Sequence, residues 1–202
     1  MNDLFSHTIL SFGFIAAAGD FIVPGIISKY YPNYSQLHDT ISTLGTNKSP
    51  VKKQASTWLI ALGFLLICFG IGQSIKFVDH TWKHWLYTWG IIAYGIGAGI
   101  ISGIFPEDPR GFEETNSGKI HGIGAGLGFI FLLLNPLVAL GIDEFNGLEL
   151  FNIILFAIGV ITFILFLVSE KNEKGVLALS GLWQRINLLA LYSPIIINYL
   201  AI

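Results

Sequence analysis

The chain has 202 residues, of which 53% are hydrophobic and only 12% are charged. Soluble domains carry about 25% charged residues, so this composition argues against a soluble globular enzyme, and its high hydrophobicity excludes disorder. The net charge of −2 offers no basic surface to nucleic acid. The single cysteine, Cys68, cannot form an internal disulfide. Together these features predict an integral membrane protein.

Six continuously apolar segments are long enough to cross a bilayer as helices, which requires about 20 residues each. They are residues 8–28, 57–75, 84–105, 120–140, 150–168 and 182–202. Since none alternates as barrel strands do, we predict an all-α fold, a polytopic membrane bundle of six transmembrane helices that forms one domain over residues 1–202. Aromatic residues near the segment ends, Trp58 among them, are typical of belts at the headgroup level.

Positive charges are distributed unevenly around these segments. All of the 11 lysines and arginines except Lys76 and Lys83 lie in or beside the regions that follow the first, third and fifth segments. Cytoplasmic loops of membrane proteins carry an excess of Lys and Arg. The pattern therefore predicts a multi-pass protein of the cell membrane with both termini outside.

Glycines at four-residue spacing predict close packing between helices, because small residues let backbones approach. Two such ridges occur, one made of Gly95, Gly99 and Gly103 and one of Gly118, Gly122 and Gly126. The same ridges could also join two copies of the chain in a homo-oligomer. A GxGAG string occurs in both ridges, and residues 13–15 are echoed by residues 128–130. These echoes suggest a 3+3 inverted repeat.

Asp20 is the only acidic residue inside a predicted span. It precedes the end of its segment by eight residues, which places it roughly 12 Å below the surface at 1.5 Å per residue. An ionised group at such depth costs about 3 kcal/mol or more unless it is paired or hydrated, so it indicates function. The alternative is a partnered carboxyl that fixes packing. Pro24, one turn later, frees a backbone carbonyl near Asp20.

The region after the first segment combines residues that nucleophilic catalysis uses. An apolar residue recurs at positions 37, 41 and 44, which predicts a short interfacial helix. In such a helix His38 and Ser42 share a face one turn apart, with Asp39 beside them. A Ser–His pair with an Asp is the material of nucleophilic catalysis. A solvated helix face is the alternative interpretation.

Further polar residues fall on the same predicted side of the membrane. Asp108 lies in a proline-flanked turn, and His121 begins the fourth segment, where a helix N-terminus would attract an anion. Arg185 is a candidate counter-ion for Asp20, Asp108 or a lipid phosphate. We expect four residues to bind substrate: Arg110, Lys119, Gln184 and Arg185.

Four short motifs occur in order along nearly the whole chain. They are His38–Gly45 (HDTISTLG), Ile104–Pro109 (IFPEDP), Lys119–Gly122 (KIHG) and Gly181–Arg185 (GLWQR). Together they resemble the prokaryotic membrane family called domain of unknown function 998. The resemblance implies a six-helix membrane protein with an I-S-x-L-G signature after the first helix, an acidic turn at Asp108 and a helix-entry histidine at His121. It implies no activity.

Three functions are compatible with these features. The first is an intramembrane hydrolase acting on a lipid or amphiphilic substrate, with a catalytic group of Asp20, His38, Asp39, Ser42, Asp108 and His121. In this hypothesis Asp20, Asp108 and His121 would hold a metal ion such as zinc, whose bound water attacks an ester or amide. The second is a proton-coupled transporter of a small molecule or lipid, with Asp20 as the protonatable group. The third is a non-catalytic scaffold that contacts membrane lipid.

Overall fold

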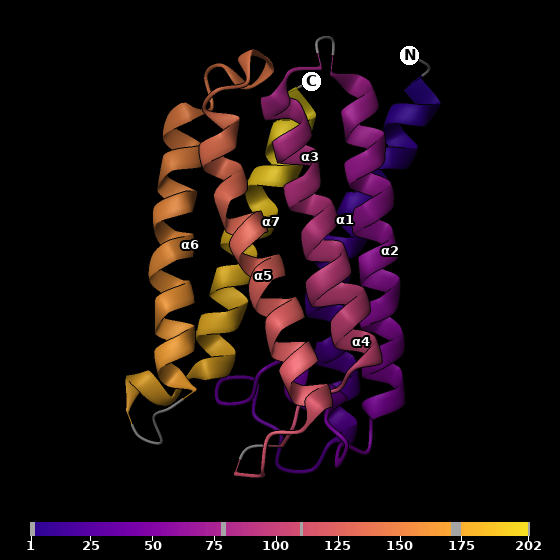
Figure 1. The fold of residues 1–202 in the computed structure, drawn as a ribbon, viewed down its shortest axis with the longest axis vertical. Helices are drawn as coiled ribbons and strands as arrows, with labels where there is room; N and C mark the ends of the chain where they lie inside the picture. Colours follow the sequence, from indigo (N-terminus) through magenta and orange to yellow (C-terminus); the bar gives the residue numbers. More distant parts are fainter. Residues whose placement is uncertain (1–2, 78–79, 110, 171–174, 202) are drawn as a thin grey trace.

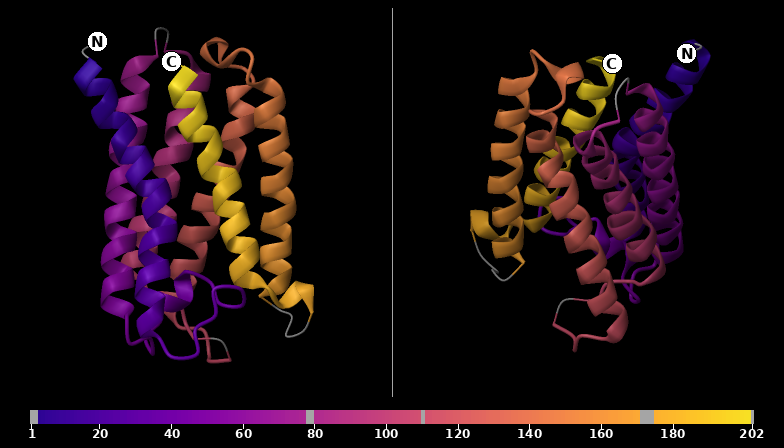
Figure 2. Two further views of the ribbon diagram at one scale, coloured as in Figure 1. Left: turned by 180° about the vertical axis from the view of Figure 1, so that it is seen from behind. Right: turned by 45° about the horizontal axis from the view of Figure 1, so that its top comes forward.

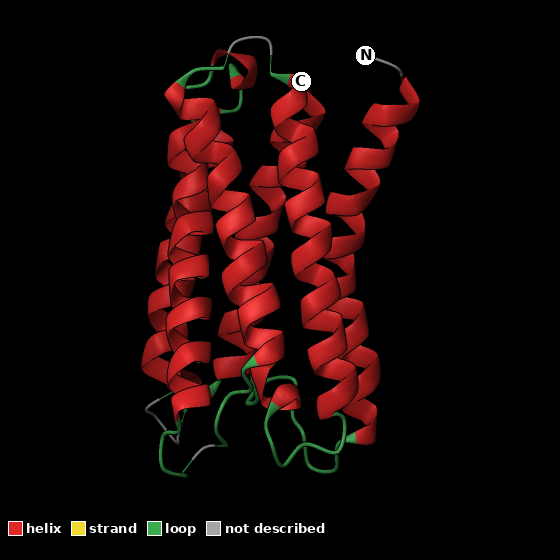
Figure 3. Ribbon diagram, turned by 45° about the vertical axis from the view of Figure 1, so that its right-hand side comes forward, coloured by secondary structure: helices red, strands yellow, loops and turns green. Residues whose placement is uncertain are grey.

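The computed structural model describes residues 3–77, 80–109, 111–170 and 175–201. All regular structure in these residues is helical, and they contain no strand (Figure 3). The main helices are α1 (Asp3–Ile27), α2 (Lys52–Lys76), α3 (Trp82–Tyr94), α4 (Ser102–Ile104), α5 (Asn116–Ala139), α6 (Glu149–Ser169) and α7 (Ser180–Ala201). Short 3-10 turns are η1 (Ser28–Tyr30), η2 (Ser42–Gly45), η4 (Asp143–Phe145) and η5 (Val176–Ala178).

The long helices stand side by side, so the bundle has two ends (Figure 1). Both chain termini lie at one end, which we call the terminal end. The connections from α1 to α2, from α4 to α5 and from α6 to α7 lie at the other, which we call the loop end (Figure 2). The predicted side with most of the positive charge is therefore the loop end.

Five helical stretches are long and apolar enough to cross a membrane, within the part of the chain that is described. They begin at His7, Lys52, Trp82, Asn116 and Glu149. Their outward surfaces carry exposed apolar side chains such as Phe14 and Ile164, as lipid contact requires. α7 has 22 residues, but Gln184, Arg185 and two asparagines reduce its hydropathy below that of the other five.

The first glycine ridge packs inside the bundle, as the sequence predicted. A Cβ added at Gly99 would stand 2.5 Å from the Cα of Gly63 in α2, and one at Gly103 would stand 2.9 Å from the Ser56 carbonyl oxygen. Gly95 approaches the Gly63 carbonyl in the same way. Because this ridge is covered by α2, it is not free to contact a second copy of the chain.

The second ridge was assigned to the wrong glycines. A Cβ at Gly122 or Gly126 would meet nothing within 4 Å. Of the predicted ridge only Gly118 is closely covered, by the Asp108 side chain, and the glycines of α5 that pack against the third stretch are Gly124 and Gly128, which lie against Gly97 and its neighbours. The fourth segment therefore uses the face next to the one that the spacing suggested, and the two GxGAG strings touch through their middle glycines.

The third membrane-spanning stretch contains a π-helical segment, Gly95–Ile101, between α3 and α4. Its glycines admit α2 on one side and α5 on the other. The Ser102 hydroxyl donates to the Gly97 carbonyl at 3.0 Å, inside the widened turn. π-helical turns occur frequently at functional sites, and this one separates Tyr94 from Ser102, two residues that line the cavity described below.

We predict that Gly99→Ala destabilises the bundle by about 1–3 kcal/mol, the usual cost of overpacking a tight core. The added methyl group would meet the Gly63 backbone, which cannot rotate away. The free energy of unfolding in mixed detergent micelles measures the loss. Gly122→Ala is the matched control, because it adds the same methyl group to open space; an equal loss in both variants contradicts the packing.

Candidate functional site

The carboxylate of Asp20 is buried in the middle of the bundle and is held by side chains from two other helices. Its Oδ1 accepts a hydrogen bond from Trp58 Nε1 at 3.2 Å, and its Oδ2 accepts one from the Tyr192 hydroxyl at 2.8 Å. The Tyr192 hydroxyl also contacts the Tyr94 hydroxyl at 3.1 Å. The residue itself is only 3% exposed. Trp58 was expected in a headgroup belt, but its indole points inward because it pairs with Asp20.

The donors to Asp20 are neutral. Among the described residues, no nitrogen of Lys, Arg or His lies within 4 Å of its carboxylate oxygens. The ion pair that these residues do form is distant from Asp20 in sequence and joins His84 to Glu144 at 3.1 Å. Arg185 is therefore not the contact counter-ion of Asp20 or Asp108 that its position suggested. A buried carboxyl with two hydrogen-bond donors and no adjacent cation is an uncommon arrangement inside a membrane.

Asp20 lines a small cavity of about 30 Å³ between the helices. Its other polar lining residues are Ser42, Tyr94, Ser102 and Gln184. A cavity needs roughly 10–15 Å³ to hold a water molecule, so this one has room for a water, and its lining supplies the polar partners that a buried water needs. Three of the predicted site residues, Asp20, Ser42 and Gln184, are thus brought together, each from a different part of the chain.

The loop between α1 and α2 closes the loop end of this cavity because Arg185 holds it in place. Nη1 of Arg185 donates to the carbonyls of Gln36 at 2.8 Å, Asp39 at 3.1 Å and Gly181 at 2.9 Å. Nη2 donates to the Tyr34 hydroxyl at 2.8 Å. A planar guanidinium can serve several acceptors at once. The interfacial helix expected over residues 37–44 is replaced by turns followed by the short 3-10 turn η2, and the Gln36 and Asp39 carbonyls that precede η2 accept from Arg185.

Tyr34 continues this network into the loop. Its hydroxyl donates to the Thr40 carbonyl at 2.9 Å. Burial raises the pKa of the Tyr34 hydroxyl, and the neighbouring Arg185 charge opposes that rise only in part. The phenol therefore keeps its proton and remains a donor. Gln184 adds a second tie, because its Oε1 accepts from the backbone N–H of Ile41 at 2.7 Å, next to Ser42.

His38 and Asp39 fix the loop and do not face the cavity. Nδ1 of His38 bonds the Ala178 carbonyl at 3.0 Å, and the Ser180 hydroxyl donates to the His38 carbonyl at 2.6 Å. Oδ2 of Asp39 accepts from the Ser35 backbone N–H at 2.7 Å. Because residues 38–41 form no α-helix, His38 and Ser42 do not share a helix face, and no hydrogen bond joins them among the described residues.

Asp108 and His121 form a separate group around the start of α5. Asp108 accepts from the Thr115 backbone N–H at 2.7 Å and from its hydroxyl at 3.0 Å, and that hydroxyl caps the helix by accepting from the Gly118 N–H at 3.1 Å. Nδ1 of His121 bonds the Phe105 carbonyl at the end of α4, at 2.9 Å. Lys119 is exposed nearby. Arg110 lies outside the described residues.

The expected metal ligands are not assembled into one set. Within the described residues, no group of three or more His, Cys, Asp or Glu side chains is placed to hold a metal ion. Asp20 lines the central cavity, whereas Asp108 and His121 line a different pocket near the α4–α5 turn. The arrangement therefore does not fit a zinc centre built from Asp20, Asp108 and His121.

An apolar groove of about 270 Å³ lies between α1 and α7. Its lining includes Phe14, Ala17 and Phe21 from α1 and Leu189 and Ile196 from α7. Tyr192 also lines the groove, and its hydroxyl donates to Asp20. One residue thus joins an apolar surface to the buried carboxylate.

The long apolar helices define this molecule as an all-helical, multi-pass membrane protein. The chain belongs to the family described as "Protein of unknown function (DUF998)", whose model matches residues 14–199. No curated protein and no solved structure matches the chain. Membership confirms the resemblance carried by the four motifs, and the contacts above show that two of these motifs, His38–Gly45 and Gly181–Arg185, meet each other.

We predict that Arg185→Gln frees the loop between α1 and α2, because hydrogen bonds to a charged donor contribute about 1.5–3 kcal/mol each. Limited proteolysis within residues 31–51 should become faster. Arg185→Lys should rescue only partly, since an ammonium cannot reproduce the planar fork. Lys52→Gln is the control, because the Lys52 ammonium donates to the exposed side chain of Asn47 and takes no part in the Arg185 contacts described above. Cleavage equal to that of the native protein in Arg185→Gln contradicts the role.

Proposed function

We propose that this protein is a proton-coupled carrier in which Asp20 binds the proton. The observation that carries the proposal is the position of the Asp20 carboxylate, buried in a membrane helix between the neutral donors Trp58 and Tyr192. It also borders a cavity large enough for water. Ionisable residues at membrane depth are typical of proton relays and transport pathways.

Protonation of Asp20 would change how the helices are held together. As a carboxylate, Asp20 accepts from both Trp58 and Tyr192; as a carboxylic acid, it carries an O–H donor of its own and must rearrange one of these bonds. Pro24 lies inside α1, four residues later. Since proline has no N–H, the Asp20 carbonyl lacks its helical partner and α1 can bend there. Proton binding is thereby linked to the contacts between α1, α2 and α7.

The groove between α1 and α7 supports the hypothesis that the transported substrate is an amphiphile. It is open on the apolar surface of the bundle, and we expect the hydrocarbon chain of a membrane lipid or a similar amphiphile to occupy it. Tyr192 both lines this groove and donates to Asp20. A molecule bound there would press on the residue that donates to the carboxylate.

The intramembrane hydrolase is supported by one observation, that Ser42 and Asp20 line the same cavity. No histidine is among the residues that line it. The imidazoles of His38 and His121 bond backbone carbonyls elsewhere. A cavity of about 30 Å³ also has no room for an ester or amide substrate. The carrier is therefore the function that the geometry favours.

We further propose that α7 is a sixth span, so that both termini lie outside the cell membrane and the loop end faces the cytoplasm. The length of α7, its place in the bundle and the positive charge of the loop end support this placement. A 3+3 inverted repeat is supported by two sequence echoes, the repeated GxGAG string and the recurrence of residues 13–15 in residues 128–130. Uncovered Gly122 and Gly126 offer a surface for a second copy.

Cysteine labelling tests this orientation. In a variant lacking Cys68, a cysteine at Asn146 should react with a membrane-impermeant maleimide on intact cells, and one at Asn47 should not.

We predict that Asp20→Asn abolishes proton flux through the protein. In proteoliposomes with an imposed pH gradient and a clamped membrane potential, a trapped pH-sensitive dye should report proton entry above that of empty vesicles. Asp20→Asn should lower this flux at least about tenfold, because the amide cannot bind and release the proton. Glu113→Gln, an exposed acid at the loop end, is the matched control and should keep the native rate.

Two results would contradict the carrier. One is a proton flux that survives in Asp20→Asn. The other is a native protein that moves no more protons than empty vesicles, since a carrier of this kind must let Asp20 exchange its proton with both sides.

A further inference from the structure

A second buried polar cluster lies near the terminal end of the bundle. Asn198 of α7 donates to the Tyr87 hydroxyl of α3 at 3.1 Å and exchanges hydrogen bonds with Asn152 of α6 at 3.1 and 3.2 Å. Asn135 of α5 donates to the Tyr87 backbone carbonyl at 3.0 Å. All four side chains are buried. Buried amides in a membrane bundle are costly unless they find partners, and here they link four helices.

Gln73 of α2 faces the same cluster, but its side-chain amide makes no hydrogen bond of good geometry with it. It has no exposed surface, and its amide lies close enough to interact with the Tyr87 hydroxyl. Neither of its amide atoms makes a hydrogen bond of good geometry, however, and the buried Thr88 hydroxyl on α3 makes none either. An unsatisfied buried polar atom costs about 1–3 kcal/mol. A water molecule bonded to these groups would remove that cost, since buried waters typically make about three hydrogen bonds.

The cluster is close to bulk water at the terminal end. Gln73 and Asn198 lie three residues before the ends of α2 and α7, and Asn152 lies three residues after the start of α6. Three residues of helix correspond to roughly 5 Å. The cluster is therefore about one helical turn below the helix ends. It lies on the terminal side of Asp20, whereas the cavity that Ser42 lines is on the loop side.

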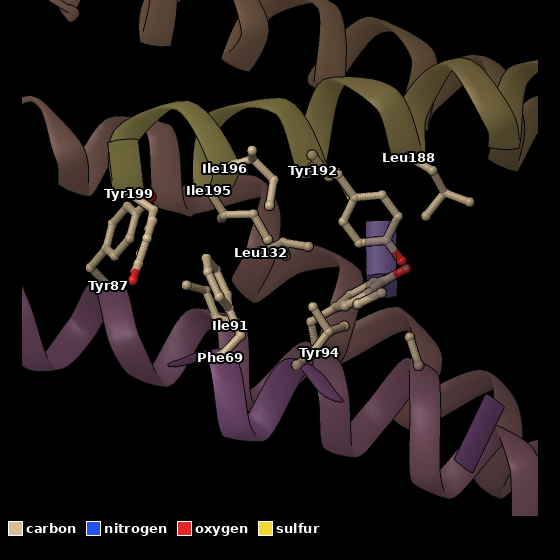
Figure 4. Close-up of a cluster of buried hydrophobic side chains, with 14 of the residues drawn as sticks. Phe69, Tyr87, Ile91, Tyr94, Leu132, Leu188, Tyr192, Ile195, Ile196 and Tyr199 are labelled. Carbon is tan, nitrogen blue, oxygen red and sulfur yellow. Dashed lines mark hydrogen bonds between the residues drawn. The ribbon is translucent and has the colours of Figure 1, made fainter. Parts of the chain in front are cut away.

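An apolar layer separates the cluster from the Asp20 group. Phe69, Ile91, Leu132 and Ile195 are all fully buried, and they lie between the Tyr87 and Tyr199 pair on one side and the Tyr94 and Tyr192 pair on the other (Figure 4). Tyr87 and Tyr94 are seven residues apart on α3, or roughly 10 Å. The layer thus closes the terminal side of Asp20, while the loop side has the cavity.

We propose that Gln73, Thr88, Tyr87 and Asn198 form a water-binding site that is the terminal-side half of the proton route to Asp20. This inference rests on the proposed carrier function. When the apolar layer opens, the Asp20 carboxyl gives its proton to water, its O–H bond breaks, and a hydrated proton and a carboxylate result. The Gln73 oxygen and the hydroxyls then accept hydrogen bonds from this hydrated proton on its way to bulk water.

The first test removes the site and leaves Asp20 intact. In the proteoliposome assay, Gln73→Met should lower the Asp20-dependent proton flux at least about tenfold. Thr88→Val, which removes the unpartnered hydroxyl with little change of shape, should lower it in the same direction. Asn187→Leu is the matched control, because Asn187 is also a buried amide with an unpartnered oxygen but bonds Gly159 and Thr162 elsewhere in the bundle. It should keep the native flux.

The second test introduces a polar side chain into the apolar layer. Ile91→Ser should raise the flux at least about tenfold by letting water cross the layer, and Asp20→Asn or Gln73→Met added to it should remove the gain. If the native protein shows Asp20-dependent flux but Gln73→Met and Thr88→Val carry it unchanged, or if Ile91→Ser leaves it unchanged, this site is overturned while the carrier stands. A native protein that shows no proton flux above empty vesicles would instead overturn the carrier itself.

Discussion

The hydrogen bonding of one buried carboxylate determines much of how this bundle is assembled. Inside a bilayer a carboxylate can be stable only if donors surround it, because neither lipid nor apolar side chains replace the water it has lost. Asp20 obtains its donors from Trp58 on α2 and Tyr192 on α7, and Tyr192 in turn contacts Tyr94 on α3. Four helices are thereby positioned around a single acidic group.

Glycine packing and loop docking make that arrangement possible. The contact of Gly99 with Gly63 brings the third stretch close to α2, and the π-helical turn that follows Tyr94 changes the direction in which later residues point. At the loop end, the Arg185 guanidinium holds the loop that carries Ser42 over the cavity. Of the polar residues that sequence analysis assigned to chemistry, His38 and Asp39 fix this loop, whereas Asp108 bonds Thr115 at the start of α5.

Much of the fold was predictable, because continuous hydrophobicity defines membrane helices without tertiary information. The helices begin and end within a few residues of the predicted segments, and the Gly95 ridge packs as its spacing indicated.

The site was less predictable. Asp20 could be identified because it is a lone acid in an apolar run, but its partners Trp58 and Tyr192 are aromatic residues among many, and only the packing selects them. The second ridge was misplaced because GIGAG offers two glycine faces, and which one meets α3 depends on helix rotation. Gln73 and Asn198 gave a signal that was overlooked, since amides inside apolar segments need partners.

Infrared spectroscopy of the carboxyl C=O stretch tests the central claim most directly. The account predicts a component of the protonated-carboxyl band that appears as the sample is acidified, is missing from the spectrum of Asp20→Asn, and shifts in frequency in Tyr192→Phe because the hydroxyl donor is gone. A carboxyl band that is identical in the native protein and Asp20→Asn, or an Asp20 component that Tyr192→Phe leaves at the native frequency, would contradict it.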